Sequence, residues 1–142
     1  MNLEMPEIGQ TISIQYGLKL TETFLGIDHY VALRIKTNKD KLKSFVFDGC
    51  SGIDDLQMKE WKILHLPWDK ILACCLKHDL KYWVGIKSNE YKERLKADLE
   101  FHRDLLDINV PREIAILFYI AVRPFGSSYF KINGVSWGFG WK

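Results

Sequence analysis

The sequence predicts a single α+β domain in which a helical core is joined to a small antiparallel sheet. Apolar residues recur at helical spacing through the middle of the chain, and short alternating runs lie toward its two ends. The chain has 142 residues, is 47% apolar and has no repeat, so it is long enough to bury one core. We divide it into an N-terminal β segment (1–44), a helical core (45–126) and a C-terminal hairpin (127–142).

The β elements are expected near the two ends of the chain. Residues 11–20 and 29–36 alternate in part between apolar and polar side chains, which is typical of half-buried strands. Residues 129–132 and 135–139 flank Asn133-Gly134, a dipeptide that supplies the two positive-φ positions of a type I′ turn. We therefore predict a C-terminal hairpin that shares one antiparallel sheet with the N-terminal strands.

Four helices are expected between the β elements. Their predicted limits are Asp54 or Asp55 to about Leu64, near Trp68 to Trp83, roughly Asn89 to Leu106, and Asn109 to just before Gly126. Aspartate and asparagine favour helix starts, Gly85 stops the second helix, and Pro111 fits the first turn of the last one. The last helix is apolar nearly all round, so we expect it to be the buried one.

The net charge and the apolar pattern of the chain bear on its partners and on where in the cell it acts. A net charge of +2 gives no bulk attraction to nucleic acid. Lys36, Lys39, Lys41 and Lys43 form a basic run, which is either a solvated loop or a contact with an anionic lipid surface. The start of the chain has no signal-peptide pattern, and the longest apolar stretch, 114–122, is short of the ~20 residues that span a bilayer. We expect a cytoplasmic protein, or one exported by a signal-independent route.

The dipeptide His78-Asp79 is the most informative feature of the sequence. Adjacent side chains on a helix point about 100° apart, so these two serve different partners. An imidazole suits proton transfer, and a carboxylate suits a hard cation. Cys75 and Tyr82 lie three positions before and four positions after His78, on the same helix face.

Asp98 is the expected partner of His78. It stands in a stripe with Leu95, His102 and Leu105, where an unpaired charge costs several kcal/mol. A histidine on an antiparallel neighbouring helix is the natural donor, and the bond would leave its other ring nitrogen as a base. The same bond is also compatible with a purely structural link between two helices.

These residues resemble the phospholipase A2 superfamily, and its small bacterial and fungal members more than the disulfide-dense animal ones. The similarity covers roughly residues 45 to 126. It is carried by the pattern Cys75, His78, Asp79, Tyr82, by Asp48-Gly49-Cys50, by Asp98 with Phe101 and Asp104, and by residues 118–123 followed by Phe125-Gly126.

The resemblance implies a calcium-dependent hydrolase that cleaves the sn-2 acyl ester of glycerophospholipids, with a phospholipid or a membrane surface as its partner. His78 would be the general base that activates water. Asp98 would orient the His78 imidazole, and Tyr82 would form a hydrogen bond with Asp98.

The resemblance also implies a Ca²⁺ site made of the Asp48 and Asp79 carboxylates, the Gly49 carbonyl and several waters. A turn-forming aspartate before glycine is the plainer interpretation of Asp48. Departures from the family are the missing glycine-rich calcium loop, Lys81 where the animal enzymes carry a cysteine, and an inserted helix between Asp48 and His78.

Three cysteines are an odd count for an obligatory disulfide framework. The resemblance implies a Cys50–Cys75 bridge with Cys74 as a free thiol, although all three would stay reduced in a reducing compartment. A zinc site of the cysteines with His78 is less favoured, because Cys74 and Cys75 point in different directions.

A second function remains open. The inserted helix would either close the site or form its mouth, so a catalytically inactive phospholipase A2-like binding or assembly module is the alternative. Trp137, Phe139 and Trp141 are either core residues or an exposed patch that contacts lipid.

Overall fold

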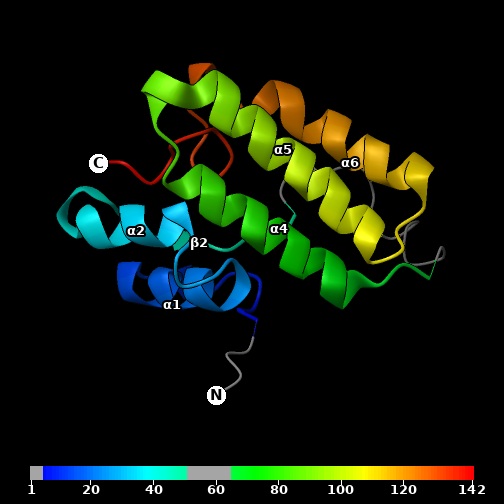
Figure 1. The fold of residues 1–142 in the computed structure, drawn as a ribbon, viewed down its shortest axis with the longest axis horizontal. Helices are drawn as coiled ribbons and strands as arrows, with labels where there is room; N and C mark the ends of the chain where they lie inside the picture. The colour runs from blue at the N-terminus through cyan, green and yellow to red at the C-terminus, as the bar shows by residue number, and fades with distance from the viewer. Residues whose placement is uncertain (1–4, 51–64) are drawn as a thin grey trace.

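Three long helices form an up-down-up layer. The computed structural model of the chain describes residues 5–50 and 65–142. The layer consists of α4 (Trp68–Trp83), α5 (Glu90–Asp107) and α6 (Arg112–Phe125), each antiparallel to the next (Figure 1). These helices agree with three of the predicted ones, except that α6 begins at Arg112 and has Pro111 rather than Asn109 as its N-cap. The fourth predicted helix, from Asp54 or Asp55 to Leu64, lies outside the described residues.

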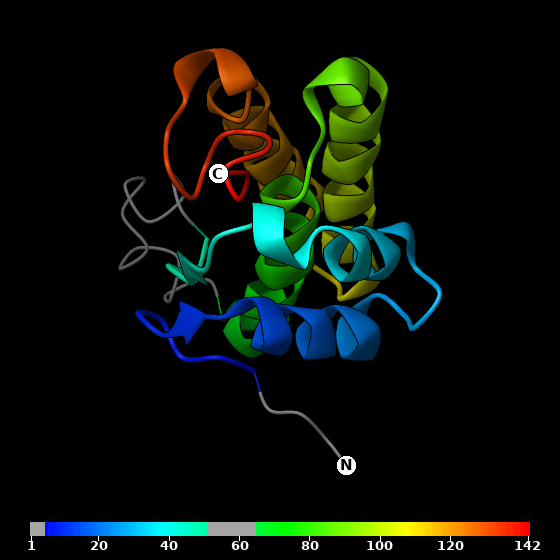
Figure 2. The ribbon, with the colours of Figure 1, turned by 90° about the vertical axis from the view of Figure 1, so that its left-hand side faces the viewer.

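Two shorter helices pack at the other side of α4: in Figure 1, α1 (Ile14–Phe24) lies below α4 and α2 (Tyr30–Thr37) lies to its left. Figure 2 shows both of them running across the direction of α4. The strand predicted over 29–36 is therefore wrong, and the one predicted over 11–20 is confirmed only at Thr11–Ile12. Each helix has a side-chain cap: Ser13 Oγ accepts from the Tyr16 N–H, and His29 Nδ1 accepts from the Val31 N–H. These caps favour helix starts where the alternation favoured strands.

The expected α+β class is confirmed in its coarse form. A two-stranded antiparallel sheet pairs β1 (Thr11–Ile12) with β2 (Phe45–Val46). Short 3₁₀ turns cover Lys39–Lys41, Lys87–Asn89 and Ser128–Phe130.

The predicted C-terminal hairpin is wrong. Gly134 has a φ of 78°, but Asn133 is not in the left-handed region, so the two positive-φ residues of a type I′ turn are not both present. The segment bonds to the end of α4 instead, through Gly138 N–H to Tyr82 O at 2.7 Å and Gly140 N–H to Trp83 O at 2.9 Å. Tertiary hydrogen bonds thus replace those of a hairpin ladder.

The expectation that α6 is buried all round is also wrong. Ala115 and Phe118 lie in the interior, whereas Ile116, Leu117 and Ile120 are 41, 49 and 55% exposed. α6 packs on α5 with its inner face and leaves its outer face open (Figure 1).

Two apolar cores divide the interior. The aromatic core lies between α4, the N-terminal helices and the C-terminal segment. The second core lies between α4, α5 and α6, and we call it the hairpin core after the antiparallel helix pair α4 and α5. The aromatic core includes Ile12, Leu20, Phe45, Tyr82, Trp83, Trp137 and Phe139. The hairpin core includes Cys50, Cys74, Cys75, Phe101, Leu105, Ala115 and Phe118.

Within residues 5–50 and 65–142, none of the helices has the length and hydropathy that a membrane-crossing helix needs.

Candidate functional site

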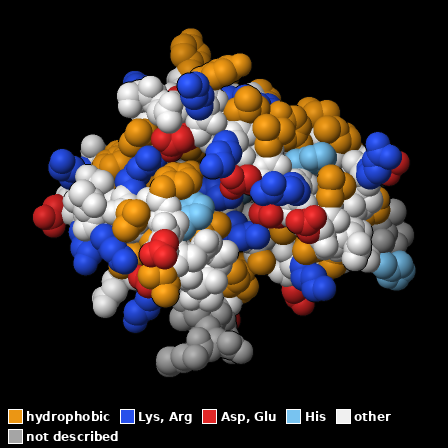
Figure 3. Space-filling view, in the orientation of Figure 1, with side chains coloured by type: hydrophobic (Ala, Val, Ile, Leu, Met, Phe, Trp, Pro, Cys, Tyr) orange, Lys and Arg blue, Asp and Glu red, His pale blue; other side chains and the backbone are white. Residues whose placement is uncertain are grey.

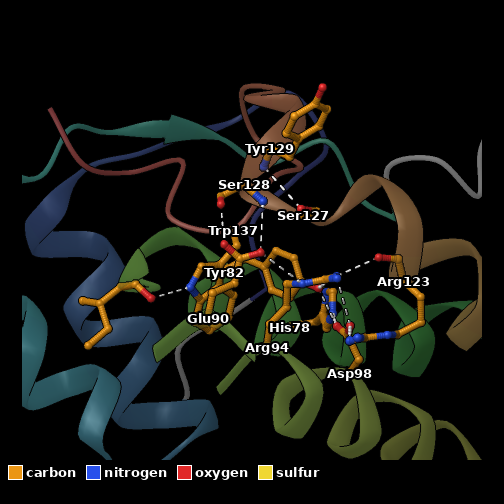
Figure 4. Close-up of polar contacts among 11 residues, drawn as sticks. His78, Tyr82, Glu90, Arg94, Asp98, Arg123, Ser127, Ser128, Tyr129 and Trp137 are labelled. Atoms are coloured by element: carbon orange, nitrogen blue, oxygen red, sulfur yellow. Dashed lines mark hydrogen bonds and ion pairs between the residues drawn. The ribbon is translucent and has the colours of Figure 1, made fainter. Parts of the chain in front are cut away.

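The centre of the site is a hydrogen bond between α4 and α5. Nε2 of His78 donates to Oδ1 of Asp98 over 2.7 Å (Figure 4). The two helices are antiparallel neighbours, as the sequence pattern required. The bond fixes the orientation of the imidazole and leaves Nδ1 as the nitrogen that can exchange a proton.

Asp98 accepts from three side chains. The Tyr82 hydroxyl donates to Oδ1 at 2.6 Å, and Arg123 Nη1 donates to Oδ2 at 2.5 Å. Arg94 forms a longer ion pair with Oδ2, at 3.6 Å. Burial by itself raises the pKa of the Asp98 carboxyl, but hydrogen bonds from His78, Tyr82 and Arg123 outweigh it and hold the pKa below its ordinary value. Asp98 is therefore a buried carboxylate kept ionised by its partners.

A second ring of contacts holds the arginines. Arg94 Nη1 donates to the Arg123 carbonyl at 2.8 Å and to the Tyr82 hydroxyl at 3.3 Å. Glu90 pairs with Arg94 at 3.6 Å and accepts from the backbone N–H and the hydroxyl of Ser128. This network joins α5 and α6 to the C-terminal segment around the Asp98 carboxylate (Figure 4).

The two arginines were not among the expected site residues. Arg94 precedes Asp98 by four positions, which is the spacing of an ion pair on one helix face, and that signal was present in the sequence. No local pattern connects Arg123 with Asp98, because only the packing of α6 on α5 brings them together.

The imidazole of His78 lies between two aromatic rings. Its centroid is 4.3 Å from that of Tyr82 and 4.7 Å from that of Phe101. Only 7% of the residue is exposed. The ring is thus fixed by packing as well as by its bond to Asp98.

The three residues expected to hold calcium come from two segments: Asp79 follows His78 on α4, and Asp48 and Gly49 follow β2. A disulfide joins Cys50 to Cys75, with 5.4 Å between their Cα atoms, and this places the segment that contains Asp48 and Gly49 beside α4. Burial, and then the nearby Asp48 carboxylate, raise the pKa of Asp79 well above its ordinary value. Two carboxylates in mutual repulsion are suited to a shared cation.

Gly49 is required at its position by the backbone. Its φ is 77°, and a Cβ there would lie 3.2 Å from Cδ1 of Ile8. In the described part of the chain, no group of three or more histidine, cysteine, aspartate or glutamate side chains is arranged to hold a metal. Any cation at Asp48 and Asp79 would thus depend on backbone carbonyls and water as well.

The cysteines are paired as the resemblance implied. Cys74 is a buried free thiol, and its burial raises its pKa to about 11. A zinc site that includes Cys50 and Cys75 is excluded while these two residues form the disulfide.

Two hollows in the surface lie away from His78. One, of about 560 Å³, is formed by the C-terminal segment, and the other, of about 480 Å³, lies along the outer face of α5. Neither is lined by His78, Asp98, Asp48 or Asp79. Of the two interpretations of the C-terminal aromatic residues, the structure favours the core for Trp137 and Phe139, which are 3 and 8% exposed.

Comparison with known proteins gives no assignment. No family model matches the chain, and neither the curated proteins nor the solved structures contain a match.

Proposed function

We propose that the chain is a calcium-dependent hydrolase of phospholipase A2 type, which cleaves the sn-2 acyl ester of glycerophospholipids. The observation that supports it best is the buried Asp98 carboxylate bonded to Nε2 of His78 and to the Tyr82 hydroxyl. A carboxylate that orients an imidazole is the arrangement that general-base activation of water requires.

In this proposal His78 acts as the general base, and the residues around it hold it in position. Nδ1 of His78 takes a proton from water as the water attacks the ester carbonyl. Asp98 holds the ring in place and stabilises the imidazolium that forms. Tyr82 and Arg123 keep Asp98 ionised and fixed, so they are positioning residues.

The same proposal assigns a calcium ion to the Asp48 and Asp79 carboxylates and the Gly49 carbonyl. The raised pKa of Asp79 beside Asp48 supports this assignment, because a divalent cation would relieve their repulsion. When bound, calcium supplies the positive charge that stabilises the developing oxyanion.

The alternative is an inactive binding or assembly module with the same arrangement of helices. Two observations favour it: neither described hollow is lined by His78, and the arginines already neutralise Asp98. Such a module would bind calcium or lipid without turnover.

Hydrolysis of a phospholipid with a fluorescent label on its sn-2 acyl chain distinguishes the hydrolase from the inactive module. The rate is measured once with calcium and once with EDTA. We expect calcium-dependent release of the labelled fatty acid. His78→Gln should lower the rate by roughly 10²–10⁴-fold, the usual contribution of a general base. His102→Gln is the matched control, because His102 lies on α5 against Tyr119 and outside the His78–Asp98 pair.

Full activity in EDTA, or in His78→Gln, would contradict the proposal. Calcium binding measured by calorimetry, together with no turnover of any phospholipid tested, would favour the inactive module.

A further inference from the structure

The hollow of about 560 Å³ lies between the C-terminal segment and the turn that follows α4. Its walls include the side chains of Lys43, Lys87, Lys131, Ile132, Trp137 and Trp141. A volume of this size is in the range of pockets that hold small organic ligands. It is separate from the His78–Asp98 pair.

Among the described residues that line the pocket, all the charged ones are positive. Lys43, Lys87 and Lys131 come from three separate parts of the chain, and none of the described lining residues is an aspartate or a glutamate. Within the described residues none of these lysines forms an ion pair, while Lys77 and Lys81 each pair with a carboxylate. Three uncompensated cations around one hollow favour an anionic ligand.

The apolar wall of the pocket is held rigidly. Trp137 Nε1 donates to the Ile86 carbonyl at 2.9 Å, and Trp141 Nε1 donates to the Gly85 carbonyl at 2.8 Å. The Trp137 indole packs directly on Gly85, where a Cβ would lie only 2.2 Å from the ring. The pocket therefore does not need to form on binding.

The chain between the lining residues Ser128 and Asn133, which we call the rim, exposes apolar side chains beside the pocket. Tyr129 is 83% exposed, Phe130 47% and Ile132 39%, and Lys131 stands among them with a left-handed backbone (φ 51°). Figure 4 shows Tyr129 pointing away from His78 and Asp98. The 3₁₀ turn Ser128–Phe130 lies at the upper edge of the molecule in Figure 1. Hydrophobic side chains project from this edge, with basic side chains beside them (Figure 3).

We propose that this pocket binds the anionic head group of a phospholipid in a bilayer, and that Tyr129, Phe130 and Ile132 enter the interface around it. Aromatic and aliphatic side chains beside lysines are suited to the boundary between acyl chains and anionic head groups. A free phosphate compound would satisfy the lysines but would leave the exposed rim without a role. The site does not depend on hydrolysis.

Vesicle sedimentation measures the charge contribution. All variants carry His78→Gln, so that the vesicles stay intact whether or not the protein is a hydrolase. Binding to phosphatidylcholine vesicles that contain phosphatidylglycerol should exceed binding to phosphatidylcholine alone. Lys43→Gln, Lys87→Gln and Lys131→Gln together should weaken binding about 100-fold, since each lysine near an anionic surface contributes roughly a factor of five.

The control is a triple variant with the same loss of charge, Lys19→Gln, Lys70→Gln and Lys92→Gln, at exposed positions outside the pocket. It should bind nearly as well as the parent protein. Equal losses in the two triple variants would overturn the proposal, because the attraction would then follow net charge alone.

The rim is tested separately. Tyr129→Ser with Phe130→Ser should weaken vesicle binding about tenfold or more, and the loss should persist at high salt, where the lysine contribution is screened. Binding of glycerol 3-phosphate to the pocket with no binding to anionic vesicles would overturn the membrane proposal and assign the pocket to a soluble phosphate compound.

Discussion

The aromatic core and the hairpin core both receive side chains from α4, but they are held together by different means. In the aromatic core the Trp83 indole fills a space that two glycines leave open. A Cβ at Gly17 or Gly140 would lie 2.5 or 2.1 Å from its ring atoms, and its Nε1 donates to the Lys43 carbonyl at 2.8 Å. The hairpin core uses a covalent bond, Cys50–Cys75, and the packing of smaller side chains.

The candidate site lies where the two cores meet. Tyr82 belongs to the aromatic core and Phe101 to the hairpin core, and the His78 ring contacts both. The site therefore has two independent supports. Close packing positions the tyrosine side, and the disulfide positions the segment with the Asp48 carboxylate.

The largest expected effect comes from removing the centre of the aromatic core. Trp83→Ala should lower the free energy of unfolding by about 3–5 kcal/mol, because it leaves a large cavity between two glycine-bearing segments. Urea unfolding monitored by circular dichroism measures the loss. Tyr129→Ala is the control, since Tyr129 is 83% exposed and its removal should change stability by less than about 0.5 kcal/mol. A loss of under 1 kcal/mol in Trp83→Ala would contradict the described packing.

The second effect concerns the hairpin core. Cys50→Ser should lower stability by roughly 3 kcal/mol, because the disulfide closes a loop with a sequence separation of 25. Apparent calcium affinity should fall with it, since the segment with Asp48 would no longer be tied to α4. Cys74→Ser should change neither quantity by much. Mass spectrometry of the unreduced protein that shows three free thiols, with calcium binding intact, would contradict this prediction.

The smallest expected effect concerns the carboxylate pair. A carboxyl whose folded-state pKa is raised stabilises the protein below its ordinary pKa, and this stability is lost as the pH rises through the raised value. Asp79 is such a group. Asp79→Asn should therefore make the calcium-free protein more stable at neutral pH and flatten its stability between acidic and neutral pH, while calcium binding is lost.

Thermal unfolding at several pH values, with and without calcium, measures this change. Ser88→Ala is a control at an exposed position on the turn after α4. If the Asp79→Asn variant is less stable than the parent protein in EDTA, the Asp79 carboxylate does not repel that of Asp48, and the prediction is wrong.

The existence of α4, α5 and α6 was predictable from the sequence because their signals are local, although the start of α6 was expected at Asn109 and lies at Arg112. The apolar period, Pro111 and Gly126 act within a few residues of the helix that they bound. The His78–Asp98 bond was also predictable, since a carboxylate in an apolar stripe requires a donor and antiparallel helices bring the two faces together. The exposure of the outer face of α6 was not predictable, because an apolar composition does not show which neighbouring elements cover each face of a helix.

The N-terminal and C-terminal segments show what the sequence did not determine. Partial alternation in residues 11–20 and 29–36 is a weak signal, and caps at Ser13 and His29 together with burial against α4 outweighed it. The Asn133-Gly134 turn signal was overridden in the same way, by backbone bonds from the C-terminal segment to Tyr82 and Trp83.

The sequence alone therefore determined the three long helices and the residues on their facing sides, because helix periodicity and capping depend on neighbours a few positions away. Only the tertiary structure decided the surroundings of Asp98 and the lysine-lined pocket. Arg123 reaches Asp98 across a separation of 25, and the pocket joins Lys43, Lys87 and Lys131. Contacts between residues so far apart in the chain follow from how the helices pack, and no local pattern encodes them.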